Sequence, residues 1–150
     1  MKQFLTGLGL LGGAMSLGRK KRTRRSSLDA YEPYVDEMLR QYLKTALWSS
    51  DDGFGNPLDR DYDISDIAQE SVDAARKDVT KFIDKAGDLL DDVEPGSAGH
   101  DFWLTRHHHG AGFWDGDYPE EVGKKLTDLS HTFRELWVSV DDDDGKIYFG

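Results

Sequence analysis

Two stretches of the chain carry apolar residues at the three- and four-residue steps of an amphipathic helix. In residues 29–48 these positions are Val35, Met38 or Leu39, Tyr42, Ala46 and Leu47. In residues 64–93 they are Ala68, Val72, Ala75, Val79, Phe82, Ala86, Leu90 and Val93. The first helix is expected to begin near Pro33, because proline suits a first turn, and the second to end at Glu94-Pro95-Gly96. The residues between them, 49–63, are rich in glycine and aspartate and are expected to form a loop.

From residue 98 onwards the pattern changes to short aromatic runs, which are typical of strands. HDFWLTR (100–106) and AGFWDGD (111–117), separated by HHHG, predict a β-hairpin. A third helix is expected to start around Pro119, with Val122, Leu126, Leu129 and Phe133 as its apolar stripe. ELWVSV and KIYFG flank DDDDG and predict a second hairpin, because Asp-Gly suits a tight turn. The order ααββαββ predicts an α+β fold of three helices packed on a roughly four-stranded antiparallel sheet made of two hairpins.

The charge of the chain divides near residue 28. Residues 1–28 contain seven basic residues and no acidic one, whereas residues 29–150 contain 12 basic and 29 acidic residues, a formal charge of −17. We therefore expect a basic, glycine-rich arm at 1–28, flexible or docked on a partner, and an acidic domain at 29–150. Residues of the arm that are suited to contact nucleic acid or an anionic membrane surface are Arg19, Lys20, Lys21, Arg22, Arg24 and Arg25. The apolar stretch of the arm is too short to span a bilayer, and its basic cluster follows that stretch, which argues against a signal peptide.

Residues 100–117 hold the densest group of side chains that bind metals. Imidazole and carboxylate groups are ligands for zinc, manganese or iron, and the chain has no cysteine to supply a thiolate. The candidate ligands are His100, His107, His109 and Asp115. Their spacing matches no standard ligand motif, so a polar turn is the preferred interpretation and no cofactor is predicted. The loop 59–70 resembles an EF-hand in part, but Ile64 stands where its sharp turn requires glycine.

The same predicted hairpin is rich in aromatic side chains. Aromatic residues on an open sheet face stack on nucleic-acid bases, and a basic residue beside them contacts phosphate. The candidates for this role are Phe102, Trp103, Arg106, Phe113 and Trp114. The acidity of the domain opposes nucleic acid, and burial of these rings in a core is the preferred interpretation.

Several segments carry a family resemblance. GHDFWLTRHHHGAGFWDGDYPE is similar to a segment written HDFWLTRNGHGAGFWD in a family of small, uncharacterised proteins of tailed bacteriophages. YLKTALWSS, PLD, ISDIA and the closing DDDDGKIYFG also resemble that family, so that the resemblance covers roughly residues 35–150. The resemblance implies a phage context but no activity, and no functional residue is carried over from it. The chain departs from the family at His107-His108, where the family has Asn-Gly, a pair that suits the positive φ angles of a type I′ turn.

These observations favour a non-enzymatic phage accessory protein that acts by binding, as a virion or assembly component tethered by its basic arm. The expected partner is a protein of phage or host origin, and the expected location is the host cytoplasm or the virion. A protein that spans a membrane is not expected. One alternative is a metal-dependent hydrolase or nuclease that uses the histidine cluster. Another is an inhibitor that occupies the DNA site of a host enzyme with its acidic surface.

Overall fold

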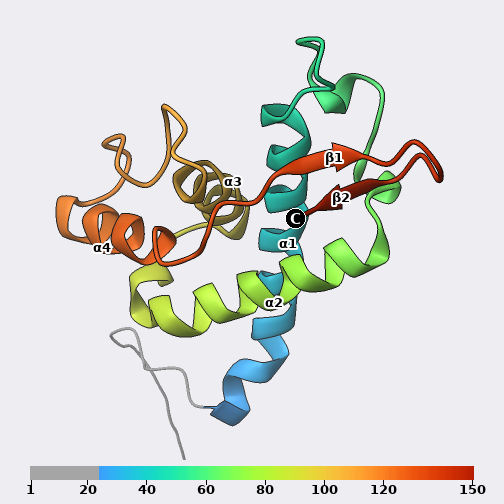
Figure 1. The fold of residues 1–150 in the computed structure, drawn as a ribbon. Helices are drawn as coiled ribbons and strands as arrows, with labels where there is room; N and C mark the ends of the chain where they lie inside the picture. The colour runs from blue at the N-terminus through green and yellow to red at the C-terminus, as the bar shows by residue number, and fades with distance from the viewer. Residues whose placement is uncertain (1–23) are drawn as a thin grey trace, which may run out of the picture. The chain divides into compact units, whose positions relative to one another are not determined.

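The computed structural model describes the backbone from residue 24 and side chains from residue 31 to the C-terminal Gly150. Its main elements are α1 (Arg24–Ser49), α2 (Gln69–Ala86), α3 (Pro95–Arg106), α4 (Glu120–Ser130), β1 (Val138–Val140) and β2 (Ile147–Phe149) (Figure 1). Three short 3₁₀ helices flank α2: η1 (Leu58–Arg60), η2 (Ile64–Asp66) and η3 (Gly87–Leu90). The chain divides into two units, residues 1–31 and 32–150, and the core, pockets and sheet described below consist of residues of the second. The side chains of the predicted basic contacts between Arg19 and Arg25 lie outside the described residues.

The first two predicted helices exist, but their ends differ from the prediction. α1 passes through Pro33 instead of beginning there. The predicted second helix is helical as α2 between Gln69 and Ala86, and Ala68 before it is extended. The Ala68 N–H donates to the Ile147 carbonyl of β2 (2.8 Å) and not to a carbonyl within the predicted helix. The α-helix therefore begins after Ala68 and not at residue 64. Gly87, with a φ of +52°, ends α2, and Pro95 opens α3 rather than terminating the helix before it.

The first strand expected in the first hairpin is helical and the second, 111–117, forms turns, so the prediction of three helices on a four-stranded sheet is wrong. HDFWLTR belongs to α3, and the only sheet within the described residues is the two-stranded antiparallel pair β1–β2. Every residue of α3 from Ala98 to Arg106 except His100 is buried. A helix that is buried on all sides has no polar face, so its sequence lacks the helical period that reveals an amphipathic helix. Its run of aromatic residues has the composition that is typical of a strand.

The third predicted helix and the second hairpin are confirmed, except that the helix ends at Ser130 and Phe133, expected on its apolar stripe, lies beyond it. α4 follows Pro119 and carries Glu120 and Glu121 in its first turn, where acidic side chains favour the helix dipole. In the hairpin, Val138 lies opposite Phe149 and Val140 opposite Ile147.

The core lies where α1, α2 and α3 meet. Phe82 of α2 stacks on Phe102 of α3 with ring centroids 4.1 Å apart, and Tyr42 of α1 lies against the same ring at 5.3 Å. α3 crosses α1 very closely, since a Cβ atom on Gly99 would stand 2.2 Å from the Met38 carbonyl oxygen. Within the described part of the chain, no helix combines the length and the apolar character that a bilayer crossing requires.

Candidate functional site

Arg106, a predicted phosphate contact, is a core residue. It is only 2% exposed, and its Nη1 donates to Asp78 Oδ2 (2.8 Å) and to the Tyr42 hydroxyl (2.9 Å). Its Nε donates to the Arg134 carbonyl (2.7 Å). Burial, partly offset by the guanidinium, raises the pKa of Tyr42 well above its usual range, so the phenol stays neutral. Arg106 therefore ties α3 to α1 and α2 and presents no charge to a ligand.

His107 is also engaged on both sides of its ring. Its Nδ1 donates to the Trp103 carbonyl (2.8 Å), and its Nε2 accepts the Leu136 N–H (3.0 Å). This pair of bonds requires the neutral tautomer with the proton on Nδ1. Burial lowers the pKa of His107 to about 4. With no free lone pair, His107 has nothing to offer a metal ion.

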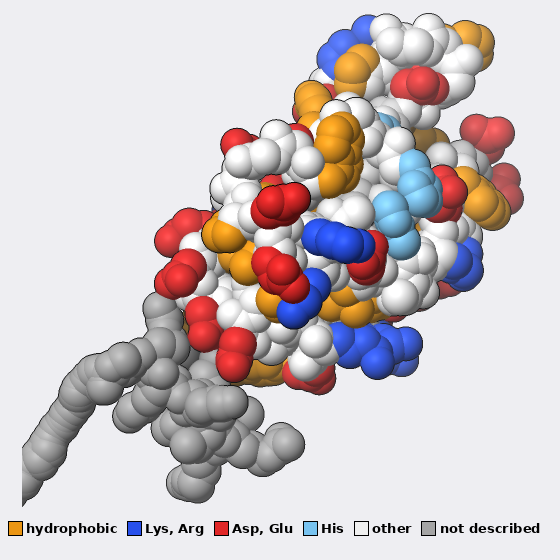
Figure 2. Space-filling view, turned by 90° about the vertical axis from the view of Figure 1, so that its left-hand side faces the viewer, with side chains coloured by type: hydrophobic (Ala, Val, Ile, Leu, Met, Phe, Trp, Pro, Cys, Tyr) orange, Lys and Arg blue, Asp and Glu red, His pale blue; other side chains and the backbone are white. Residues whose placement is uncertain are grey.

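The other predicted ligands do not meet in a metal site. Figure 2 shows histidine side chains gathered on one face of the domain. His108 stacks on His131 with ring centroids 4.4 Å apart. Asp115 accepts the Gly112 N–H (3.3 Å) and orders its own turn. Among the side chains that the structure describes, no group of three or more His, Asp or Glu is placed to hold a metal ion, and this includes His100 and His109.

The predicted aromatic face does not form. Phe102, Trp103 and Phe113 are buried, in agreement with the preferred interpretation that they belong to the core. Trp114 differs, because it is 53% exposed. A single exposed ring from this segment offers no platform for successive bases.

A pocket of about 390 Å³ lies instead at the C-terminal end of α1, beside η1 and η2. We call it the Trp48 pocket. Its aromatic and apolar lining consists of Leu47, Trp48, Tyr62, Ile64 and His100, and its polar lining of Gln41, Lys44, Thr45, Asp59 and Asp63. Trp48 is 54% exposed, and its ring lies 5.9 Å from that of His100 at a 30° tilt.

The walls of the Trp48 pocket are held by hydrogen bonds. Trp103 Nε1 donates to Ser49 Oγ (2.8 Å), which fixes the end of α1 against α3. The Leu58 N–H donates to the Ser50 carbonyl (2.9 Å) and turns the acidic loop back onto α1. Asp63 caps η2 by accepting the Ser65 N–H (2.8 Å). The hydrogen bonds from Ser65 hold the pKa of Asp63 below its usual range, so its carboxylate is ionised.

His100 is oriented from behind by a buried carboxylate. Its Nδ1 lies 3.1 Å from Asp101 Oδ1, and Asp101 Oδ2 accepts the Tyr118 hydroxyl at 2.5 Å. Because a carboxylate only accepts, the Nδ1 of His100 carries the proton. Burial, and then the bond to Asp101, raise the pKa of Tyr118 well above its usual range. The ring of His100 is thus a preset part of the pocket wall.

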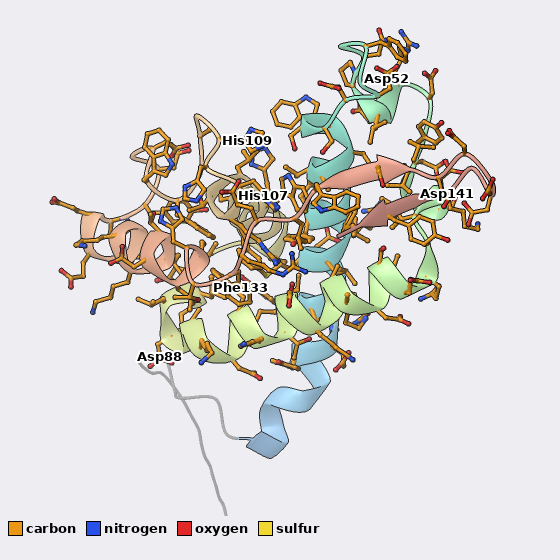
Figure 3. All side chains as sticks on the ribbon, viewed as in Figure 1. Asp52, Asp88, His107, His109, Phe133 and Asp141 are labelled. Atoms are coloured by element: carbon orange, nitrogen blue, oxygen red, sulfur yellow. The ribbon has the colours of Figure 1, made fainter. Side chains whose placement is uncertain are left out.

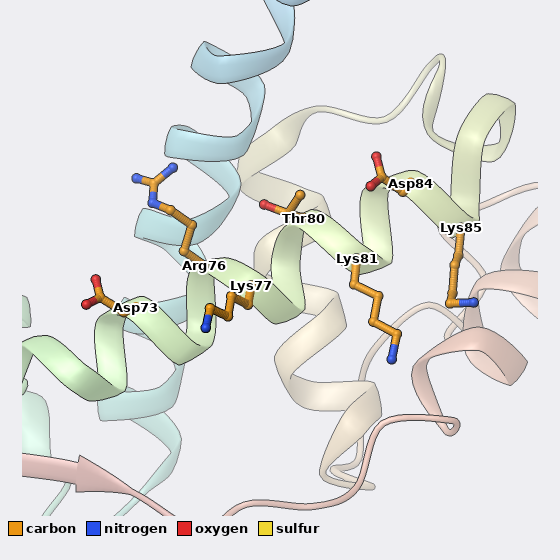
Figure 4. Close-up of a pocket in the computed structure, with 7 residues that line it drawn as sticks. All are labelled: Asp73, Arg76, Lys77, Thr80, Lys81, Asp84 and Lys85. Atoms are coloured by element: carbon orange, nitrogen blue, oxygen red, sulfur yellow. The ribbon is translucent and has the colours of Figure 1, made fainter.

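A second hollow runs along α2 and is lined by four basic residues and by Asp73 and Asp84 (Figure 4). Lys77, Lys81 and Lys85 follow one another at four-residue steps, which places them on one side of the helix. Arg76 beside them is neutralised by Asp36 (2.7 Å) and Glu32 (3.8 Å) of α1. In the sequence this four-residue spacing is typical of the polar face of a surface helix and does not by itself indicate a site.

No protein-family model, curated protein or solved structure matches the chain. The Trp48 pocket joins four segments that lie apart in the sequence. Trp48 belongs to YLKTALWSS, Asp59 to PLD, Ile64 to ISDIA and His100 to GHDFWLTR. Sequence reasoning missed this pocket, although Trp48 gave a signal: it stands off the apolar stripe of its helix, directly before an acidic loop.

Proposed function

We propose that the protein is a non-enzymatic accessory protein of a tailed bacteriophage that acts by binding a protein partner in the Trp48 pocket. The observation that carries this proposal is a half-exposed indole over a pocket whose walls are already fixed. Tryptophan is enriched among the residues that dominate protein interfaces, and a preformed pocket avoids the entropic cost of ordering its side chains.

The chemistry of the pocket favours a basic side chain of the partner. An arginine or lysine can lay its aliphatic stem on Leu47 and Ile64 and its cation over the Trp48 ring. Asp59 and Asp63 supply negative charge at the same pocket. The formal charge of −17 on residues 29–150 would further accelerate the approach of a basic partner.

The phage context of this proposal comes from the sequence resemblance. The basic arm, residues 1–28, would tether the domain to nucleic acid or to an anionic surface in the host cytoplasm or in the virion. The partner itself would be a phage or host protein that carries an exposed basic segment.

A direct test titrates the protein with N-acetyl-arginine amide and with N-acetyl-leucine amide, followed by nuclear magnetic resonance. The arginine compound should shift the indole signal of Trp48 and the amide signals around Tyr62 at concentrations at which the leucine compound does not. Equal shifts from both compounds would contradict a basic ligand, and no shift at Trp48 would contradict the site.

The partner can be sought by affinity capture from phage-infected cells with two matched variants. Trp48 and Trp114 are 54% and 53% exposed, so Trp48→Ala and Trp114→Ala remove equally exposed indoles. We expect Trp48→Ala to weaken capture about 30-fold, the effect of losing a central interface residue, and Trp114→Ala to retain it. Equal capture by both variants would contradict the proposal. Release of the partner by duplex DNA would instead support an inhibitor of a DNA-binding enzyme.

A further inference from the structure

The two edges of the β1–β2 sheet differ in their hydrogen bonding. The outer edge of β2 is occupied by residues at the start of α2. The Ala68 N–H donates to the Ile147 carbonyl (2.8 Å), and the Phe149 N–H donates to Ser71 Oγ (3.0 Å). Figure 1 shows β2 on the side of the sheet that faces α2, and β1 on the opposite side. An additional strand can therefore pair only with β1.

The register of the hairpin shows which groups of β1 point outward. Trp137 and Gly150 exchange two hydrogen bonds of 2.9 Å, and the Asp141 N–H donates to the Lys146 carbonyl (2.8 Å). In an antiparallel pair, hydrogen-bonded and non-hydrogen-bonded positions alternate. Ser139 therefore bonds to β2, whereas the N–H and C=O groups of Val138 and Val140 point away from it. No other segment of residues 24–150 forms a backbone hydrogen bond with these outward groups.

The surroundings of this open edge are aromatic and acidic. Trp137 precedes β1 and is 66% exposed, and it lines a hollow of about 550 Å³ together with Tyr148 and with Asp141, Asp142 and Asp143 of the turn. Asp141 accepts the Asp143 N–H (2.7 Å) and so is held in place beside the strand. Figure 3 shows Asp141 at the turn end of the hairpin. The edge thus ends in a cluster of carboxylates.

From this geometry we infer that β1 accepts an extended, basic segment of a protein partner as a third strand. The outward N–H and C=O groups of Val138 and Val140 bond to the backbone of the incoming strand. Alternate side chains of that strand then lie on the face of Trp137 and Asp141, where basic residues meet the carboxylates and rest their stems on the indole. This surface is separate from the Trp48 pocket, and the inference does not depend on the function proposed for that pocket.

The test uses a short peptide of alternating lysine and valine as the probe. We expect it to shift the amide signals of Val138 and Val140, and the same peptide with glutamate in place of lysine to leave them unchanged. Trp48→Ala should bind the lysine peptide as the unsubstituted protein does, which separates this surface from the Trp48 pocket. Absence of shifts in residues 138–140 would overturn the inference.

Two substitutions at one position isolate the backbone bond. Val140→Pro removes an outward N–H that the sheet does not use, and proline is tolerated on a strand edge in that orientation. We expect Val140→Pro to weaken peptide binding about tenfold, the effect of one or two lost hydrogen bonds, and Val140→Ala to change it less than about twofold. Equal affinities of the two variants would overturn the inference.

A variant of the probe guards against misfolding of Val140→Pro. Methylation of the alternate backbone nitrogens of the lysine–valine peptide removes the donors along one of its edges. Two such peptides are compared, each methylated along a different edge. The peptide methylated on the edge that faces β1 should lose binding to the unsubstituted protein, and the other should keep it. Retained binding in both cases would overturn a strand-addition mode even without the proline variant.

Discussion

Two regions of the molecule contain side chains that suggest chemistry, and they use them in opposite ways. In α3 and the turn after it, Asp101, Arg106 and His107 bond to other parts of the domain. By contrast, Trp48, Trp114 and Trp137 are all more than half exposed. Asp101, Arg106 and His107 are therefore occupied within the domain, whereas the three exposed indoles are available to a partner.

Several residues in and directly after α3 have structural roles. Gly99 permits the close crossing of α1. Thr105 Oγ1 accepts the Phe113 N–H (3.0 Å) and binds the loop after α3 to the helix. Position 108 needs a left-handed residue, since His108 has a φ of +57°. These residues thus serve the fold. Substitutions in α3 and the turn after it should therefore change stability more than substitutions of the exposed tryptophans.

The largest effect is expected from Arg106→Ala, which would leave the buried Tyr42 hydroxyl and the partly buried Asp78 carboxylate without their partner. Loss of the charge-assisted bond to Asp78, together with an unsatisfied buried hydroxyl, lowers the free energy of unfolding by about 4 kcal/mol. Urea unfolding followed by circular dichroism measures this loss. Trp114→Ala is the control from the exposed group and should change stability by less than about 0.5 kcal/mol. Similar losses in both variants would erase the distinction between the two regions.

Gly99→Ala should be nearly as damaging. The added Cβ would stand 2.2 Å from the Met38 carbonyl oxygen, and a backbone atom cannot move aside without separating α1 from α3. We expect a loss of about 3 kcal/mol in urea unfolding. Gly96→Ala is matched to it in the same helix, because the nearest atom is the end of the Glu37 side chain at 3.9 Å. An unchanged midpoint for Gly99→Ala would show that the crossing is looser than the structure indicates.

His107 predicts a pH dependence of stability. Its folded pKa of about 4 lies below the unfolded value of about 6.5, so the unfolded chain binds the proton more tightly. The stability from neutral His107 is therefore complete above pH 6.5, falls as the pH drops toward 4, and is constant below that. The loss is about 2 kcal/mol after allowance for partial solvent contact. Unfolding measured across this range should fall more steeply for the unsubstituted protein than for His107→Gln; parallel profiles would contradict the assignment.

The smallest effect is a gain. His108 is the one non-glycine residue with positive φ among the described residues, and glycine adopts this conformation without strain. His108→Gly should raise the free energy of unfolding by up to about 1 kcal/mol, less the contact with His131. Thermal unfolding detects the change, and His131→Ala measures the contribution of the contact. A destabilised His108→Gly together with a neutral His131→Ala would show that backbone strain is absent.

The extent to which the fold is predictable depends on the exposure of each element. α2 and α4 each have one solvent-exposed and one buried face, so the spacing of their apolar residues predicts them. The Asp-Gly turn predicts the hairpin. α3 could not be found in this way, because its polar residues are buried with partners far along the chain, as Arg106 is with Tyr42. The Trp48 pocket was also beyond sequence reasoning. Its walls come from α1, the acidic loop and α3, and their meeting depends on the helix that the sequence did not show.

The distribution of the four tryptophans has a consequence for spectroscopy. Trp103 is buried and stacks on His107 with ring centroids 3.8 Å apart, whereas the other three indoles already meet water in the native protein. Intrinsic fluorescence should therefore shift little in wavelength when the chain unfolds, because most of its emitters do not change their surroundings. The same emission should move to shorter wavelength when a partner covers Trp48 or Trp137. In this protein the natural fluorophores serve as reporters of occupancy rather than of folding.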